Sequence, residues 1–184
     1  MRAVELLMEE HRVIERALTL LELAAAKMER GERVPKEVLK ELLNFFRVFA
    51  DKCHHGKEED ALFPLLEVRG VPREGGPIGV MLYEHQLGRG YIKAMTEALD
   101  AIERDSEAKT RFTKNALNYL SLLREHIFKE DNILFRIALE VLDEKDNENL
   151  ITKFKNIEET KVGVGVHEQM IDKLDEIEQL LKTS

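Results

Sequence analysis

The sequence has no tryptophan and only one cysteine, Cys53, among its 184 residues. A single cysteine excludes an internal disulfide framework and is typical of a reducing compartment. The first residues, MRAVELLMEEH, carry glutamates and a histidine where a secretory signal needs an apolar run. No other apolar stretch is long enough to cross a membrane. We therefore expect a soluble, cytoplasmic protein with no membrane association.

Strongly basic runs are also missing. The formal net charge is -8, and binding to nucleic-acid phosphates depends on clustered lysine and arginine. The charge therefore argues against a nucleic-acid partner. Hydrophobic residues make up 43% of the chain, which is enough for a substantial core.

Proline and glycine are scarce, with 4 and 10 residues, and they gather at a few breaks. These breaks are GERVP (31–35), RGVPREGGP (69–77) and GVG (163–165), to which we add the polar DEKDNEN (143–149) and a tight, helix-capping turn at 105–106. The apolar periodicity between them predicts helices at about residues 3–29, 36–67, 77–104, 107–142 and 166–182, with a short piece near 148–160. Short connections between long helices favour antiparallel neighbours. We expect an all-α, up-down-up-down four-helix bundle over residues 1–145, with a C-terminal helical extension, residues 146–184, packed on it.

Each of the four long helices has a histidine within its apolar stripe, and two have a glutamate one turn later. The stripe of the fourth helix also predicts that Ile133 and Ile137 face inward. Counted along the predicted helices, the histidines of the first two lie at one level, as do those of the last two. The connection between these pairs leaves a mismatch of about 7 Å, which its length can absorb. The six inward polar residues are His11, His54, Glu58, His85, His126 and Glu130.

Four imidazoles and two carboxylates in an apolar core are costly unless something compensates them. A pair of divalent metal ions does so if each ion takes two histidines while Glu58 and Glu130 bridge the ions. The HxxxE spacing supports this, because residues four apart share one helix face. One histidine on an apolar face is usually a satisfied core residue. Six such groups from four helices at nearly one depth favour a metal site.

The same segments resemble the hemerythrin-like, or HHE cation-binding, family. The matching pieces are EEHRVIE around His11, HHGKEEDALFP from His54, MLYEH ending at His85 and EHIFKEDNILF around His126, spanning about residues 8–137. The resemblance implies a non-heme di-iron centre, in which an oxo or hydroxo group can bridge the two iron ions, inside a four-helix bundle. It places the six inward residues in the ligand positions.

The resemblance to oxygen-carrying hemerythrins is incomplete. Those proteins have HxxxH on the third helix and HxxxxD on the fourth, which gives five histidines. Here Met81 and Arg89 flank His85 at four residues, so we interpret one imidazole as missing. On the fourth helix we prefer Glu130 to Asp131, because Glu130 lies on the apolar stripe. The resulting set is more similar to the di-iron proteins that repair iron-sulfur clusters after nitric oxide stress, whose short cysteine-containing N-terminal domain has no counterpart in this sequence.

Other polar groups fall outside the predicted ligand set. His55 and Glu59 lie about 100° around the helix from the ligands; we expect them at a helix interface or behind the ligands, where a carboxylate can orient an imidazole. Cys53 is expected to be a small buried residue. Tyr119 either lines the pocket or packs in the core. His167 is expected to be structural, on a helix that covers the bundle, with a position in the site as the alternative.

The leading hypothesis is a di-iron protein that binds or senses oxygen, nitric oxide or a peroxide at the coordination position left by the missing histidine. We expect a binding protein more than a dedicated enzyme. One alternative is iron storage, iron donation or iron-sulfur cluster repair. Another is a structural zinc or manganese site in a domain whose output is a protein partner.

Overall fold

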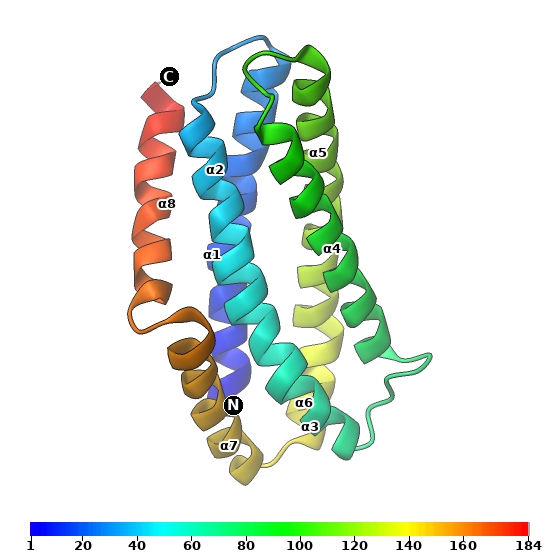
Figure 1. The fold of residues 1–184 in the computed structure, drawn as a ribbon. Helices are drawn as coiled ribbons and strands as arrows, with labels where there is room; N and C mark the ends of the chain where they lie inside the picture. Colours follow the sequence, from blue (N-terminus) through cyan, green and yellow to red (C-terminus); the bar gives the residue numbers. More distant parts are fainter. Residues whose placement is uncertain (184) are drawn as a thin grey trace.

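The computed structural model describes residues 1–183, and that part of the chain is helical with short connections and contains no strand (Figure 1). The predicted all-α class is therefore confirmed. None of the described helices combines the length and the apolar character that a membrane span needs. The α-helices are α1 (Arg2–Glu29), α2 (Lys36–Phe45), α3 (Phe63–Val68), α4 (Pro77–Leu99), α5 (Ser106–Lys129), α6 (Phe135–Val141), α7 (Glu144–Ile157) and α8 (Val166–Thr183). Four π-helical segments join them: η1 (Phe46–His55), η2 (Glu58–Leu62), η3 (Glu130–Leu134) and η4 (Glu158–Val162).

Four long rods form the body of the molecule. The first is α1, the second runs from α2 through η1 and η2 to α3, the third is α4, and the fourth runs from α5 through η3 to α6. Figure 1 shows these rods side by side with alternating chain direction, and α7 and α8 along one side of the bundle. Helix α8 buries Leu174, Ile177 and Leu181 in the core that it shares with α1 and α2. The C-terminal helices thus pack on the bundle, while the division near residue 145 stays a prediction.

Side-chain caps set two helix starts that sequence analysis located only roughly. The Asp105 carboxylate accepts a hydrogen bond from the Glu107 amide at 2.8 Å and begins α5. Asp143 and Asp146 form a reciprocal capping box, with bonds of 2.9 and 3.1 Å. Helix α7 therefore begins at Glu144, and most of the polar segment 143–149 is helical instead of a break. In contrast, α4 ends at Leu99, before the predicted residue 104, because the chain turns through residues 100–104.

The wide π turns change the inward face of two rods. A π-helix has i→i+5 hydrogen bonds, so each wide turn holds more residues than an α-helical turn and shifts the register after it. After η3 begins, Leu134 and Ala138 are 1% and 0% exposed, whereas Ile133 is 50% exposed. Ile137 is only partly buried at the edge of the core. The prediction that Ile133 faces inward is wrong, because it carried the α-helical register through η3.

Two apolar cores lie on either side of a central polar layer. Leu7 belongs to one core and Ile14 to the other, and His11 lies between them on α1. Helix α4 passes from one core to the other in the same way, through His85. The four rods therefore bring their inward polar residues to one level.

A matched pair of variants tests the register after η3. Leu134→Ala should lower the free energy of unfolding by about 2–5 kcal/mol, because it leaves a cavity in the core. Ile133→Ala should change it by less than about 0.5 kcal/mol, because half of that side chain is in solvent. Urea unfolding of the metal-loaded protein measures both. If Ile133→Ala lowered the free energy of unfolding more than Leu134→Ala, the α-helical register would continue through residue 133 and the assignment of η3 would be contradicted.

Candidate metal centre

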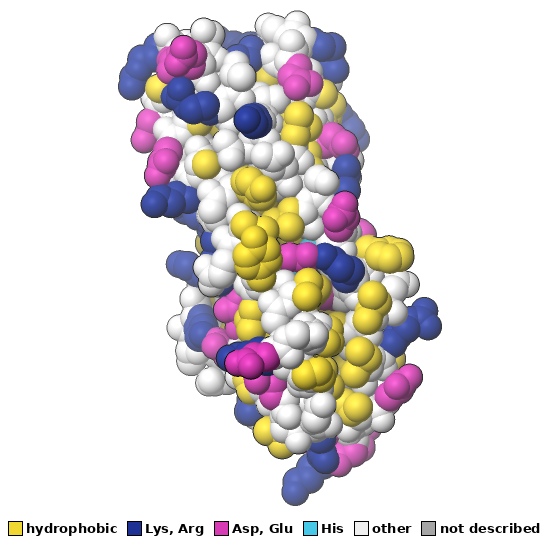
Figure 2. All heavy atoms as spheres, turned by 90° about the vertical axis from the view of Figure 1, so that its right-hand side faces the viewer, with side chains coloured by type: hydrophobic (Ala, Val, Ile, Leu, Met, Phe, Trp, Pro, Cys, Tyr) yellow, Lys and Arg dark blue, Asp and Glu magenta, His cyan; other side chains and the backbone are white. Residues whose placement is uncertain are grey.

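All six predicted residues lie in the central polar layer, and each is at most 1% exposed. Figure 2 shows almost no histidine (cyan) on the face formed by α4 and α5, although each of these helices carries one. The layer is therefore largely covered on this side. The residues brought together are His11, His54, Glu58, His85, His126 and Glu130.

Their ligating atoms form two overlapping groups, and a seventh residue joins them. Within each group, one nitrogen or oxygen atom from every residue lies within 4.8 Å of the others. The first group consists of His11, His54, Glu58 and Glu130. The second group consists of His55, Glu58, His85 and His126.

Glu58 lies between the two groups. Its Oε1 atom is 3.6 Å from His54 Nε2, and its Oε2 atom is 3.4 Å from His85 Nε2. Both oxygens are buried, and neither has a hydrogen-bond partner among the described residues. A buried carboxylate without donors is strongly unfavourable. A cation on each side of Glu58 would satisfy both oxygens, so the residues present fit a pair of metal ions.

Glu130 approaches from the opposite rod. Its Oε2 atom is 3.1 Å from His11 Nε2 and 3.3 Å from His126 Nε2. Its Oε1 atom and His54 Nε2 are also buried, and neither has a hydrogen-bond partner within residues 1–183. Glu130 thus lies between imidazoles of both groups, as Glu58 does.

The two glutamates have opposite proton affinities when no metal is bound. Burial raises the pKa of Glu58 well above its ordinary value, and the negative charge of Glu130 raises it further. Burial alone would also raise the pKa of Glu130, but the charge of His126 and the hydrogen bonds from His11 and His126 hold it well below its usual value. Without cations in the layer, Glu58 therefore holds a proton more readily than Glu130 does.

His55 is the residue that sequence analysis placed elsewhere. Its side chain is buried, and its ring stacks on that of His85, with centroids 3.8 Å apart and planes at 15°. The π-helical turns of η1 reduce the angle between successive side chains, so His54 and His55 both enter the polar layer. Among the described residues the layer therefore holds five imidazoles, one more than the predicted set supplies, and the set of metal ligands itself stays a prediction. The doubled histidine was the only sequence signal for it.

A carboxylate faces the outer nitrogen of every imidazole in the layer. An acceptor at Nδ1–H fixes the tautomer whose lone pair is on Nε2, the nitrogen that points into the layer. Glu59 orients an imidazole, as expected for it, and Asp131 does the same. Sequence analysis missed Glu10, Asp51 and Glu84, although two of them directly precede a ligand histidine. The Nδ1 pairs are His11–Asp131 at 2.7 Å, His54–Glu10 at 2.9 Å, His55–Asp51 at 3.3 Å, His85–Glu59 at 2.7 Å and His126–Glu84 at 2.9 Å.

Each outer carboxylate also contacts a cationic side chain. Arg89 holds two of them, since its Nε is 2.8 Å from Asp51 and its Nη2 is 2.8 Å from Glu59. Burial alone would raise the pKa of Asp51, but hydrogen bonds from His55 and Arg89 lower it to about 2. The outer carboxylates therefore stay ionised and available to the imidazoles. The remaining pairs are Arg12–Asp131, Lys57–Glu10 and Lys129–Glu84.

The C-terminal helices contact the layer through Glu10. His167 Nε2 is 3.4 Å from Glu10 Oε1, so His167 lies behind an outer carboxylate and outside both ligand groups. A third set of possible ligands, Glu10, Cys53 and Glu158, surrounds Lys57, whose ammonium group contacts both glutamates. That ammonium occupies the place a cation would take. Burial, together with the charge of Glu10, raises the pKa of Cys53 to about 12, which makes the thiol unreactive.

Comparison with known proteins places this geometry in context. The family model for the hemerythrin HHE cation-binding domain matches residues 2–138. An uncharacterized protein of Mycobacterium tuberculosis is 26% identical over 182 residues, covering 97% of this chain and 70% of that protein. The iron-sulfur cluster repair protein YtfE of Escherichia coli O81 is 32% identical over 122 residues, covering 64% of this chain. That match spans 56% of the repair protein, a little over half of its length.

Proposed function

The chain belongs to the hemerythrin HHE cation-binding family, and from this premise we propose that it is a non-heme di-iron protein that binds or senses oxygen, nitric oxide or a peroxide. The observation that carries the proposal is the placement of Glu58, whose two unpartnered oxygens face imidazoles of different groups. Histidine and carboxylate donors together suit iron. Bound iron would supply the electrons and the coordination position for such a ligand.

The two ligand groups are unequal, which indicates where a small ligand would bind. His11 and His54 would hold one ion, whereas the three imidazoles of His55, His85 and His126 would hold the other, and Glu58 and Glu130 lie between the two groups. The ion held by His11 and His54 has fewer protein donors. We therefore place the exogenous ligand on the side of His11 and His54, in place of the position first assigned to a missing histidine.

Aromatic side chains border the layer and restrict water. Phe135 stacks on His11, with centroids 5.4 Å apart and planes at 10°. Phe63 stacks on His85 at 5.9 Å and 20°. These rings hold the imidazoles of His11 and His85 in place and cover part of the layer, which would slow uncontrolled oxidation of a reduced metal pair.

Metal analysis and rapid mixing test the proposal. Expression with iron supplied should give about two iron ions per chain and a near-ultraviolet charge-transfer absorption in air that bleaches on reduction. Mixing the reduced protein with oxygen, and separately with nitric oxide, should give a saturable spectral change in a stopped-flow experiment. Purification with a single zinc ion per chain would contradict the di-iron assignment and would favour a structural site.

Iron donation or cluster repair is the second candidate. The observation that favours it is the 32% identity to a protein described as an iron-sulfur cluster repair protein. Transfer of iron from the loaded protein to an apo-ferredoxin, in competition with a ferrous chelator, separates the two functions. Fast transfer would support repair, whereas retention of iron together with reversible ligand binding would support sensing or carriage.

A further inference from the structure

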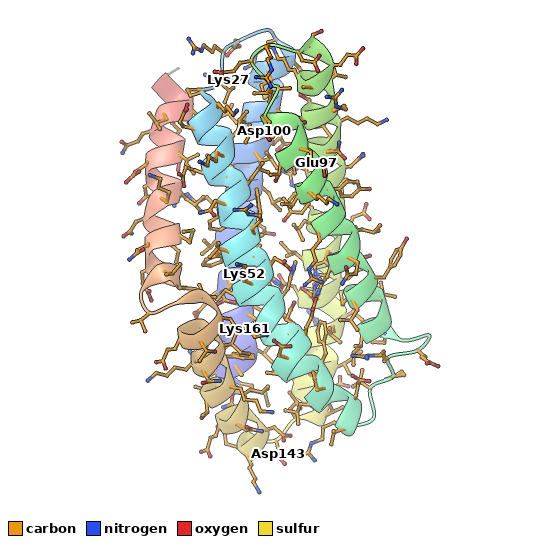
Figure 3. The ribbon with its side chains drawn as sticks, in the orientation of Figure 1. Lys27, Lys52, Glu97, Asp100, Asp143 and Lys161 are labelled. Atoms are coloured by element: carbon orange, nitrogen blue, oxygen red, sulfur yellow. The ribbon has the colours of Figure 1, made fainter. Side chains whose placement is uncertain are left out.

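A cavity of about 320 Å³ lies beside the metal centre, between η1 and α4, with α5 behind it. These are the rods that carry the labels Lys52 and Glu97 in Figure 3. The inner end of the cavity is formed by His55 and His85, on the side of the layer with three imidazoles. The exogenous ligand of the proposed function belongs on the opposite side. The apolar walls of the cavity are formed by Phe46, Ile92, Tyr119 and Leu123.

The charged groups at the inner end of the cavity are already paired. Arg89 contacts Asp51 and Glu59, and Glu84 accepts from His126 Nδ1. They leave no unpaired charge at the inner end. The outer end is lined by Lys93 and Glu97, which lie 3.9 Å apart, and by Arg47, which donates to Asn44 Oδ1 at 3.4 Å. Because a buried charge without a partner is strongly unfavourable, the inner part of the cavity favours an uncharged occupant.

One polar group on the wall is open to the cavity. Tyr119 lines the cavity and is 3% exposed, and its hydroxyl makes no hydrogen bond within residues 1–183; that oxygen is not among the buried atoms without a partner, so it is accessible from the cavity. Its ring packs edge-on against Phe46, with centroids 5.0 Å apart, which fixes the side chain. An accessible hydroxyl is satisfied by water or by another hydrogen-bonding group. An occupant with one such group would take the place of that water.

We propose that this cavity binds a small uncharged organic molecule, with an apolar body of about two rings and one hydroxyl or comparable group paired with Tyr119. The size follows from the volume, because a cavity of about 150 Å³ holds benzene. The occupant contacts His55 and His85, which form the inner end of the cavity. Its influence on the metal pair rests on the proposed function, whereas its binding does not.

Fluorescence titration with 2-naphthol tests the binding. The chain has no tryptophan, so the emission of the naphthol is not masked, and zinc-loaded protein avoids quenching by iron. We expect saturable binding of one 2-naphthol per chain, followed by fluorescence anisotropy and displaced by naphthalene. Tyr119→Phe should weaken 2-naphthol about tenfold, since one hydrogen bond contributes roughly 1.4 kcal/mol, and should leave naphthalene unaffected.

A cavity-filling variant and a matched control locate the site. Ile92→Phe should weaken 2-naphthol more than tenfold while unfolding cooperatively. Val80→Phe, which adds a ring at an exposed position of α4 outside the cavity, should bind as the parent does. Absence of saturable binding, or equal binding by Ile92→Phe and the parent, would overturn the proposal.

Metal content measured on the same preparations separates this proposal from the proposed function. Two iron ions per chain without 2-naphthol binding would refute only the proposal that the cavity binds a small organic molecule. Binding of 2-naphthol by a protein that takes up no iron would refute only the di-iron function. When both hold, 2-naphthol should shift the charge-transfer absorption of the iron-loaded parent and not that of Ile92→Phe.

Discussion

The Glu58→Gln variant should lose nearly all of its bound metal. Glu58 offers one oxygen to each ligand group and has no other partner, so an amide removes the charge and one acceptor at once. We expect metal affinity to fall by more than ~100-fold, beyond the loss typical of an outer hydrogen-bond partner. Elemental analysis after dialysis against a chelator measures the loss. The metal-free variant should unfold at a higher temperature than the metal-free parent, because burial and Glu130 disfavour the charge of Glu58.

Glu59→Gln is the matched control, one residue along the same segment. Glu59 lies outside the ligand groups and accepts from His85 Nδ1 at 2.7 Å, a role that an amide oxygen can keep. Metal affinity should fall by about tenfold, the lower end of the range for such partners. Equal losses from the two variants would refute the assignment of Glu58 as the residue between the ions.

The His55→Ala variant should retain about one iron ion per chain instead of two. His55 is one of three imidazoles in the second group and takes no part in the first. Its loss should weaken the second ion by ~100-fold or more, while His11 and His54 still hold the first. Iron content and the strength of the charge-transfer absorption measure the change.

His167→Ala is the control for the loss of a histidine. His167 contacts the polar layer through Glu10 and lies outside both ligand groups, so its replacement should leave both ions in place. Two tightly held ions in His55→Ala would show that His55 merely packs on His85. Loss of an ion in His167→Ala would show that the C-terminal helix takes part in holding the metal.

The predicted ligands could be found from sequence because they occupy α-helical stripes. His11 and His85 follow the regular spacing of buried residues along helices that stay α-helical throughout. His126 precedes η3 and Glu130 begins it, so the same spacing still located them. On the second rod His54 lies near the end of η1, and Glu58 begins η2 four residues later, so the HxxxE spacing located this pair. Periodicity is a local property, and it holds as long as the hydrogen-bond pattern does not change.

The position of His55 and the face of Ile133 could not be found in this way. Both depend on i→i+5 turns, and no residue type in η1 or η3 distinguishes such a turn from an α-helical one. The outer carboxylates depend on tertiary contacts. Asp131 and His11, for example, are 120 residues apart in the chain and come together only when the rods pack.

The polar layer also divides the molecule into two apolar cores, and this affects how it unfolds. Each core is held by its own side chains, whereas the layer between them contains buried groups that repel or lack partners when no cation is bound. A bound metal pair would connect four rods at their midpoint and would make opening of one core costly for the other. We therefore expect metal occupancy to change the cooperativity of unfolding as well as the stability: the loaded protein should unfold as one unit, and the metal-free protein as two weakly coupled units.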